Sequence, residues 1–201
     1  MRYGVFGGTF DPPHNGHLAL AGAAGRQLAL DRVLWVITAD PPHKHGLLIS
    51  PVSDRLDMVA AAIAGCPEYE ISRVDIDRPG PHWAADTVAL LSQAHPGAEL
   101  VYLMGSDSLR DLPTWGRPQE ILRHASLGVL RRPGIEVATS ALEGPLPGIS
   151  NKVAFVSAPR VQVSSRQIRR RVARGEPIDG LLPPAVARII LERGLYRHPP
   201  Q

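Results

Sequence analysis

The sequence predicts an α/β fold in which a mostly parallel sheet is covered by helices on both faces. Six short apolar runs, partly β-branched or aromatic and bounded by Gly, Pro or Asp, have the character of strands. Helical patterns lie between these runs, and strands that alternate with helices usually form a parallel sheet. Because 201 residues suit one domain with a sizeable core, we expect a single domain over residues 1–201.

The elements follow one another along the chain. The first strand is expected at 3–6, and a glycine turn leads from it into an Ala- and Leu-rich helix at 17–29. Further strands are expected at 32–37, 69–74, 99–104, 126–130 and 152–156. Further helices are expected at 53–64, 83–94, 118–123, 165–174 and 184–193. The proline-rich stretches 41–51 and 133–148 are expected to be loops.

The glycine turn between the first strand and the first helix carries two histidines, in the sequence GGTFDPPHNGH over residues 7–17. Backbone N–H groups at a helix N-terminus attract anions, and glycine lets a phosphate approach the main chain. The imidazoles of His14 and His17 add donors or positive charge. A metal site is the alternative, but no Cys or third well-spaced ligand is nearby, so we expect none. The turn therefore predicts a phosphate site.

Composition narrows the class of partner. Lys and Arg number 22 against 19 acidic residues, which gives a net charge of +3 and a pI near 9.4, compatible with a polyanionic ligand. The arginine-rich stretch 166–174 could bind nucleic acid, but no aromatic interleaving or zinc-finger spacing accompanies it. We therefore expect a small phosphorylated ligand and no nucleic-acid partner.

The number of cysteines and the hydropathy of the chain predict the cellular compartment of the protein. Cys66 is the only cysteine, so it cannot form an internal disulfide, and a reducing environment is expected. The N-terminus has a strand pattern in place of a charged region followed by an apolar run, and no stretch reaches the roughly 18 apolar residues of a membrane span. The sequence therefore predicts a cytoplasmic protein with no membrane partner.

Three further segments carry residues suited to a nucleotide. Lys44 follows two prolines in a loop, and its flexible stem can carry an ammonium to a phosphate, although a solvated surface lysine is the alternative. Asp107 follows a strand and suits a ribose hydroxyl or magnesium, with helix capping by Ser106 or Asp107 as the alternative. Ser164 and Ser165 are N-cap residues, and Arg169 lies one helical turn beyond them.

These four segments, in this order, resemble the HxGH nucleotidyltransferase superfamily and, within it, the bacterial nicotinate mononucleotide adenylyltransferases. The resemblance runs from Met1 to about Tyr196. It implies a Rossmann-like, doubly wound fold and the ATP-dependent conversion of nicotinate mononucleotide to deamido-NAD and pyrophosphate, with Mg²⁺ on the ATP phosphates. The attack on the α-phosphorus is direct and in line, so catalysis rests on positioning and charge stabilisation.

The resemblance also implies roles for particular residues. The catalytic set is His14, His17, Lys44 and Arg169, with His17 stabilising the α-phosphate as charge develops. ATP is bound by the same His14, His17 and Arg169 together with Gly8, Thr9, Phe10, Asp107, Arg132, Ser164 and Ser165. Nicotinate mononucleotide is bound by Gly7, Gly8, Lys44, Trp83, Ala84, Asp107 and Trp115, the last by stacking on the pyridine ring.

The acceptor pocket departs from the family's pattern. Gly116 stands where a second aromatic ring is common after Trp115, and Trp83-Ala84 replaces a usual Tyr-Thr pair. Main-chain recognition of a carboxylate survives the change from Thr to Ala, so we expect nicotinate mononucleotide to be preferred over nicotinamide mononucleotide. Arg166 replaces a usual Thr, and its role stays open.

Several alternatives remain open at the level of sequence. The acceptor can be nicotinamide mononucleotide, both mononucleotides or phosphopantetheine. A nucleotide-binding regulator without turnover, contacting nucleic acid through its arginine-rich helix, is the alternative outside enzymes. The sequence does not separate a site role from a solvated face for Arg55 and Arg78, and it leaves open a homo-oligomer and the order of substrate binding.

Overall fold

A computed structural model describes residues 1–41, 48–131, 134–159 and 161–197. Its six strands form one sheet in the order β3-β2-β1-β4-β5-β6, and neighbouring strands are parallel throughout the described pairs. The strands are β1 (Arg2–Gly8), β2 (Arg32–Ile37), β3 (Tyr69–Ser72), β4 (Glu99–Gly105), β5 (Ala125–Leu130) and β6 (Val153–Val156). This is the doubly wound order, with its reversal between β1 and β4, where such sheets bind ligands.

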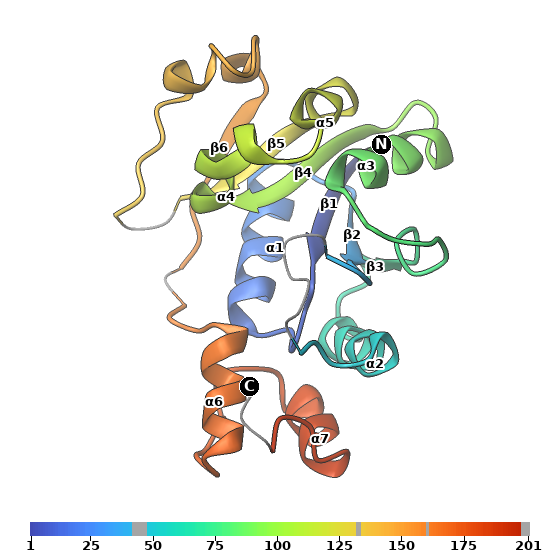
Figure 1. The fold of residues 1–201 in the computed structure, drawn as a ribbon, viewed down its shortest axis with the longest axis vertical. Helices are drawn as coiled ribbons and strands as arrows, with labels where there is room; N and C mark the ends of the chain where they lie inside the picture. The colour runs from blue at the N-terminus through green and yellow to red at the C-terminus, as the bar shows by residue number, and fades with distance from the viewer. Residues whose placement is uncertain (42–47, 132–133, 160, 198–201) are drawn as a thin grey trace.

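Helices connect the strands and cover both faces of the sheet (Figure 1). They are α1 (Asn15–Gln27), α2 (Val52–Ile63), α3 (Ala84–Ala94), α4 (Ser106–Asp111), α5 (Pro118–His124), α6 (Ser165–Ala173) and α7 (Pro184–Glu192). Short 3₁₀ helices stand at η2 (Leu112–Thr114), η3 (Thr139–Leu142) and η4 (Ile149–Asn151). The six predicted helices are confirmed, whereas α4 was not predicted because six residues are too few to show a helical period.

The sheet separates two hydrophobic cores. Side chains alternate along a strand, so in β2 Trp35 and Ile37 face the core shared with α1, α2, α6 and α7. Leu34 and Val36 of the same strand face the core shared with α3, α4 and α5. The predicted fold class is therefore confirmed. None of the helices in the described ranges is long and apolar enough to cross a membrane.

The C-terminal helices occupy one end of the molecule, where α7 lies beside α2 (Figure 1). Arg193, just after α7, donates hydrogen bonds to Asp54 and Asp57 of α2 at 2.6 Å each. This packing brings the last described residues back to the turn that follows β1.

Candidate active site

The histidine turn, residues 7–17, leaves the sheet at the reversal of strand order. A Cβ at Gly8 would lie 2.9 Å from the ring of Phe10, so glycine is needed where the chain turns over this ring. Phe10 has a φ of +49° and is 2% exposed, with its ring centroid 5.1 Å from those of Trp35 and His17. The side chain of Phe10 thus belongs to the core, which leaves only its backbone for a ligand.

The two histidines form one unit. Their rings stack with centroids 3.7 Å apart and an interplanar angle of 18°. The backbone N–H of His14, the N-cap of α1, donates to Nδ1 of His17 at 3.2 Å. Because Nδ1 of His17 accepts this bond, the proton of its neutral ring is carried by Nε2. The turn therefore fixes the orientation of the His17 ring.

The start of α6 is hydrogen-bonded to the histidine turn. Ser165 Oγ donates to the carbonyl oxygen of Pro12 at 2.9 Å, and Arg169 Nη1 donates to that of Asp11 at 2.7 Å. Ser164 is the N-cap, and its Oγ accepts from the backbone N–H of Gln167 at 3.2 Å. Two segments about 150 residues apart in sequence, both predicted to bind phosphates, are thus joined directly.

The carboxylate of Asp11 connects the histidine turn to distant segments of the chain. It is 4% exposed and accepts a hydrogen bond from the Tyr196 hydroxyl at 2.6 Å and another from the backbone N–H of Ser50 at 3.3 Å. Burial and the nearby Asp11 charge raise the pKa of Tyr196 well above its usual value. Tyr196 therefore remains a hydrogen-bond donor across the neutral range.

Arg55 of α2 holds together the loops that follow β1 and β2. Its side chain is fully buried, and burial lowers the pKa of the guanidinium while the charge of Asp11 opposes that shift. The guanidinium donates to four carbonyl oxygens at 2.8–3.1 Å, those of Thr9, Thr38, Ala39 and Ser50. Arg55 is therefore neither on a solvated face nor in the cleft, but supports the turn from within.

A cleft of about 690 Å³ opens beside the turn at the carboxyl ends of β1 and β4. This volume is typical of small-molecule sites, which measure about 300–1,000 Å³. Predicted site residues that line it are Gly7, Gly8, Thr9, Trp83, Ala84, Asp107 and Trp115. The predicted phosphate residues His14, His17, Ser164, Ser165 and Arg169 are not in this lining; the two histidines lie on the adjoining turn, and the other three lie at the start of α6, which is hydrogen-bonded to that turn. Lys44 and Arg132 lie outside the described residues.

Asp107 reaches the cleft from the start of α4. The N-cap of this helix is Gly105, and Ser106 and Asp107 are its first two helical residues. The capping alternative for Ser106 or Asp107 is therefore not what this helix shows. Instead, the half-buried Asp107 lines the cleft at the end of β4, opposite the glycines that end β1.

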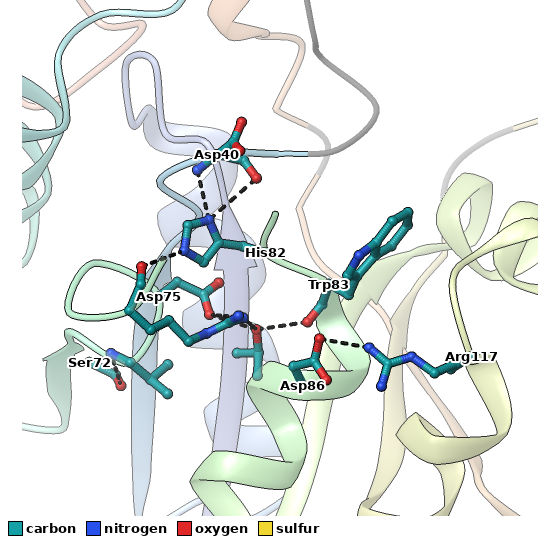
Figure 2. A network of polar contacts seen from close by, with 10 residues as sticks. Asp40, Ser72, Asp75, His82, Trp83, Asp86 and Arg117 are labelled. Atoms are coloured by element: carbon teal, nitrogen blue, oxygen red, sulfur yellow. Dashed lines mark hydrogen bonds and ion pairs between the residues drawn. The ribbon is translucent and has the colours of Figure 1, made fainter. Parts of the chain in front are cut away.

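The start of α3, whose N-cap is Trp83, also lines the cleft. A buried network holds this end in place (Figure 2). The Thr87 hydroxyl lies 2.8 Å from Asp75 Oδ1 and 3.1 Å from the carbonyl oxygen of Trp83, and Arg78 Nη2 donates to Asp75 Oδ1 at 2.8 Å. Arg78 thus supports the cleft wall through Asp75 and does not lie on a solvated face.

His82 joins the loop after β2 to the loop before α3 (Figure 2). Its Nδ1 accepts from the backbone N–H of Asp40 at 2.9 Å, and its Nε2 lies 3.1 Å from the carbonyl oxygen of Arg78. Both ring nitrogens therefore contact backbone groups. The ring is 5% exposed, so this histidine is part of the support of the cleft.

Trp83 occupies the space beside Gly116. A Cβ added at Gly116 would lie 2.5 Å from Cε3 of the Trp83 indole. Trp115 also lines the cleft and meets Tyr102 edge to face, with ring centroids 6.2 Å apart. The sequence suggested that a second aromatic ring is missing at position 116, and in the structure the Trp83 ring lies where a side chain at that position would begin.

Comparisons with known proteins agree with this arrangement. Residues 5–171 match the cytidylyltransferase-like family model. A protein of Thermomicrobium roseum named "Probable nicotinate-nucleotide adenylyltransferase" is 46% identical over 98% of this chain and 92% of its own length. A Thermus thermophilus protein of the same name is 40% identical over 98% of this chain and 100% of its own length. The chain belongs to the nicotinate-nucleotide adenylyltransferase family. The predicted resemblance is thus confirmed.

The fold of this adenylyltransferase-family chain also matches solved structures. Plasmodium falciparum nicotinic acid mononucleotide adenylyltransferase complexed with NaAD superposes with a TM-score of 0.78 at 18% identity, covering 98% of this chain and 97% of that one. The same enzyme complexed with APC has a TM-score of 0.77 at 17% identity. At these identities the match supports the Rossmann-like architecture alone.

Sequence reasoning missed the buried polar support of the site. One signal was available for Arg55, which shares a helical face with the buried Met58, Val59 and Ala62 at the spacing of a core stripe. A charge in such a stripe has to be paired or hydrogen-bonded. Asp11, Asp75 and Tyr196 offered no comparable signal, because their partners are distant in sequence or in loops.

Proposed function

We infer that this protein transfers the adenylyl group of ATP to nicotinate mononucleotide, forming deamido-NAD and pyrophosphate in NAD biosynthesis. The observation that carries this inference is that α6 is hydrogen-bonded to the histidine turn, next to a cleft lined by Asp107 and Trp115. Relatives named for the activity, at 46% and 40% identity over 98% of the chain, support it.

In the proposed reaction, a phosphate oxygen of the mononucleotide attacks the α-phosphorus of ATP. The bond from that phosphorus to the bridging oxygen breaks, and pyrophosphate leaves with the electron pair. The phosphate nucleophile is already largely ionised near neutral pH, so no general base is needed. The Nε2 donor of His17 then stabilises the charge that develops on the α-phosphate oxygens, with His14 stacked on it.

The remaining phosphate and nucleoside contacts are proposed from the same geometry. Arg169 and Lys44 provide cations for the triphosphate, with Lys44 complementing His14 and His17 in the catalytic set. The backbone of Gly8, Thr9 and Phe10 lines the phosphate region, and the hydroxyls and first-turn amides of α6 add donors. The full ATP set is His14, His17, Gly8, Thr9, Phe10, Asp107, Arg132, Ser164, Ser165 and Arg169.

The acceptor is proposed to lie between the start of α3 and Trp115. The first backbone N–H groups of α3 have no partner within the helix, and Ala84 lines the cleft there. They favour the nicotinate carboxylate over a neutral amide by about 0.3–1 kcal/mol. The proposed acceptor set is Gly7, Gly8, Lys44, Trp83, Ala84, Asp107 and Trp115.

Magnesium is proposed to enter with ATP. Mg²⁺ prefers oxygen ligands, and nucleotide sites hold it largely through phosphate oxygens, water and one or two carboxylates. The cleft offers the carboxylate of Asp107, and within the described ranges no group of three or more His, Cys, Asp or Glu is placed to hold a metal ion. This donor set fits an ion bound mainly by the phosphates, where it offsets the charge of the leaving pyrophosphate.

The proposal also includes that the chain forms one domain and that the protein works in a reducing compartment. Both cores share the single sheet, which supports one domain over the chain. The free thiol of Cys66 supports a cytoplasmic location.

Incubation of the purified protein with ATP, Mg²⁺ and one acceptor at a time tests the function. The acceptors are nicotinate mononucleotide, nicotinamide mononucleotide and phosphopantetheine, and the products are separated by chromatography. Deamido-NAD and pyrophosphate are expected, with the highest kcat/KM for nicotinate mononucleotide. If neither pyridine mononucleotide gives a dinucleotide, the proposal is wrong. Tight ATP binding without product, together with salt-sensitive DNA binding, would favour a regulator.

A further inference from the structure

Trp83 is a surface tryptophan held at a fixed place. The residue is 37% exposed and lines the cleft together with Trp115. Its backbone is fixed, because its carbonyl oxygen accepts the first backbone bonds of α3 and lies 3.1 Å from the Thr87 hydroxyl. Figure 2 shows the indole extending away from the polar network that holds this backbone. The ring is therefore presented to the cleft from a rigid base.

Gly116 makes room for this ring. A side chain at position 116 would begin 2.5 Å from Cε3, 2.9 Å from Cζ3 and 3.0 Å from Cδ2 of the indole. The first two contacts are shorter than real Cβ atoms make, so a residue other than glycine would displace the ring. The next residue, Arg117, forms an exposed ion pair with Asp86 of α3 at 2.7 Å, so the segment lies directly beside the helix (Figure 2).

We propose that Trp83 and Gly116 act as a pair that determines how the acceptor ring is held. Gly116 leaves the space in which the indole packs, and the indole then presents a second aromatic surface to the planar ring of the acceptor in the cleft that Trp115 also lines. A cationic pyridine ring is attracted to an indole face as well as stacked on it. This inference rests on the proposed function, since it assigns the pair to the acceptor of that reaction.

The test is a double-mutant cycle on the whole enzyme. Gly116→Ala is expected to raise the KM for nicotinate mononucleotide about fivefold, the size of one aromatic contact. The KM for ATP and kcat are expected to stay within about twofold, because the pair lies at the acceptor end. Trp83→Ala is expected to raise the same KM by at least as much. Trp83→Ala/Gly116→Ala is expected to match Trp83→Ala, since no indole remains to be displaced.

A matched control is Gly144→Ala in the segment between η3 and η4, where an added Cβ meets no atom within 4 Å and no positive φ is needed. This variant is expected to keep the KM of the unmodified enzyme. Thermal melting of every variant separates loss of the fold from loss of the contact. An unchanged acceptor KM in Gly116→Ala, or independent losses that multiply in the double variant, would overturn the proposal while leaving the proposed function intact.

A second measurement does not depend on turnover. Nicotinate mononucleotide is titrated against the intrinsic tryptophan fluorescence of the unmodified protein and of Trp83→Phe. Part of the quenching is expected to be lost in Trp83→Phe, with affinity lowered less than in Trp83→Ala because a ring is retained. Identical quenching and affinity in both proteins would contradict contact between the indole and the acceptor. Failure of the proposed function would appear separately, as absence of deamido-NAD from the unmodified protein.

Discussion

The two ends of the candidate site differ in the residues that form them: polar hydrogen-bonding groups at one end and aromatic side chains at the other. At the proposed phosphate end, the buried Arg55 and the partly buried Arg169 and Ser165 hold the backbone of the histidine turn by donating to its carbonyl oxygens. At the acceptor end, two tryptophans line an open cleft, and an exposed ion pair joins α3 to the segment after Trp115. Adenylyl transfer, as proposed, needs hydrogen-bond donors that are fixed before charge develops on the phosphate, whereas a flat ring needs only a surface of the right shape.

This contrast predicts different responses to mutation. Removing a buried polar group leaves other buried groups without hydrogen bonds, so damage at the phosphate end should be large and should spread. Removing a side chain at the acceptor end should lose only the interaction energy of that side chain, without weakening its neighbours. Three substitutions test the contrast, from the largest expected effect to the smallest.

Arg55→Met is expected to lower the free energy of unfolding by about 3–5 kcal/mol, because four carbonyl oxygens lose their donor inside the protein. For a chain of this length the melting temperature should fall by roughly 10 °C. Urea denaturation measures the change. The control is Arg73→Met, which removes an exposed arginine paired with Asp77. Equal stabilities of the two variants would mean that the buried guanidinium does not support the turn.

His17→Asn is expected to lower kcat by about 100-fold or more while ATP affinity falls much less, because its donor acts chiefly as charge develops. Asn can accept the backbone N–H that His17 Nδ1 accepts at 3.2 Å, so the turn should persist. Steady-state kinetics beside equilibrium ATP binding measure the two effects. The control is His124→Asn at the end of α5, beside Glu120. Equal losses of turnover and binding would refute the assigned role of His17.

Arg117→Ala is expected to cost less than about 1 kcal/mol of stability and to raise the acceptor KM less than about twofold. The ion pair that it removes is exposed, with side-chain exposures of 55% for Arg117 and 34% for Asp86. Arg123→Ala, which breaks an exposed pair with Glu120 elsewhere on the surface, is the control. A tenfold rise in KM specific to Arg117→Ala would show that the ion pair, and not packing, holds the cleft.

Much of the fold could be predicted from the chain because it depends on local patterns. The apolar run at 32–37 became β2 with those bounds, and the Ser164-Ser165 pair became the start of α6 as N-cap preference predicts. Predicted helices were displaced by one or two residues, as at Trp83, which is a cap and not a helical residue. The strand at 69–74 ends at Ser72, and α4 was missed because it is one short turn after β4.

The candidate site was predicted only in part. The glycine turn, Asp107 and Trp115 could be found because ordered motifs name them, and the cleft does bring Gly8, Asp107 and Trp115 together. The bond from Arg169 to the turn was not predicted, because it joins residues 158 apart in sequence. The packing of the Trp83 ring against Gly116 could not be predicted either, because neither residue indicates which side chain lies next to it.

The sequence by itself determined the alternation of strands and helices and the glycine turn between β1 and α1, and it predicted the residues that are proposed to carry the chemistry. These depend on side-chain period, glycine and capping, which act over a few residues. Tertiary structure alone decided which groups support that chemistry: Arg55 beneath the turn, Tyr196 on Asp11, and the indole of Trp83 over Gly116. Such contacts require distant segments to pack at fixed distances, and only the folded sheet, with its reversal between β1 and β4, supplies those distances.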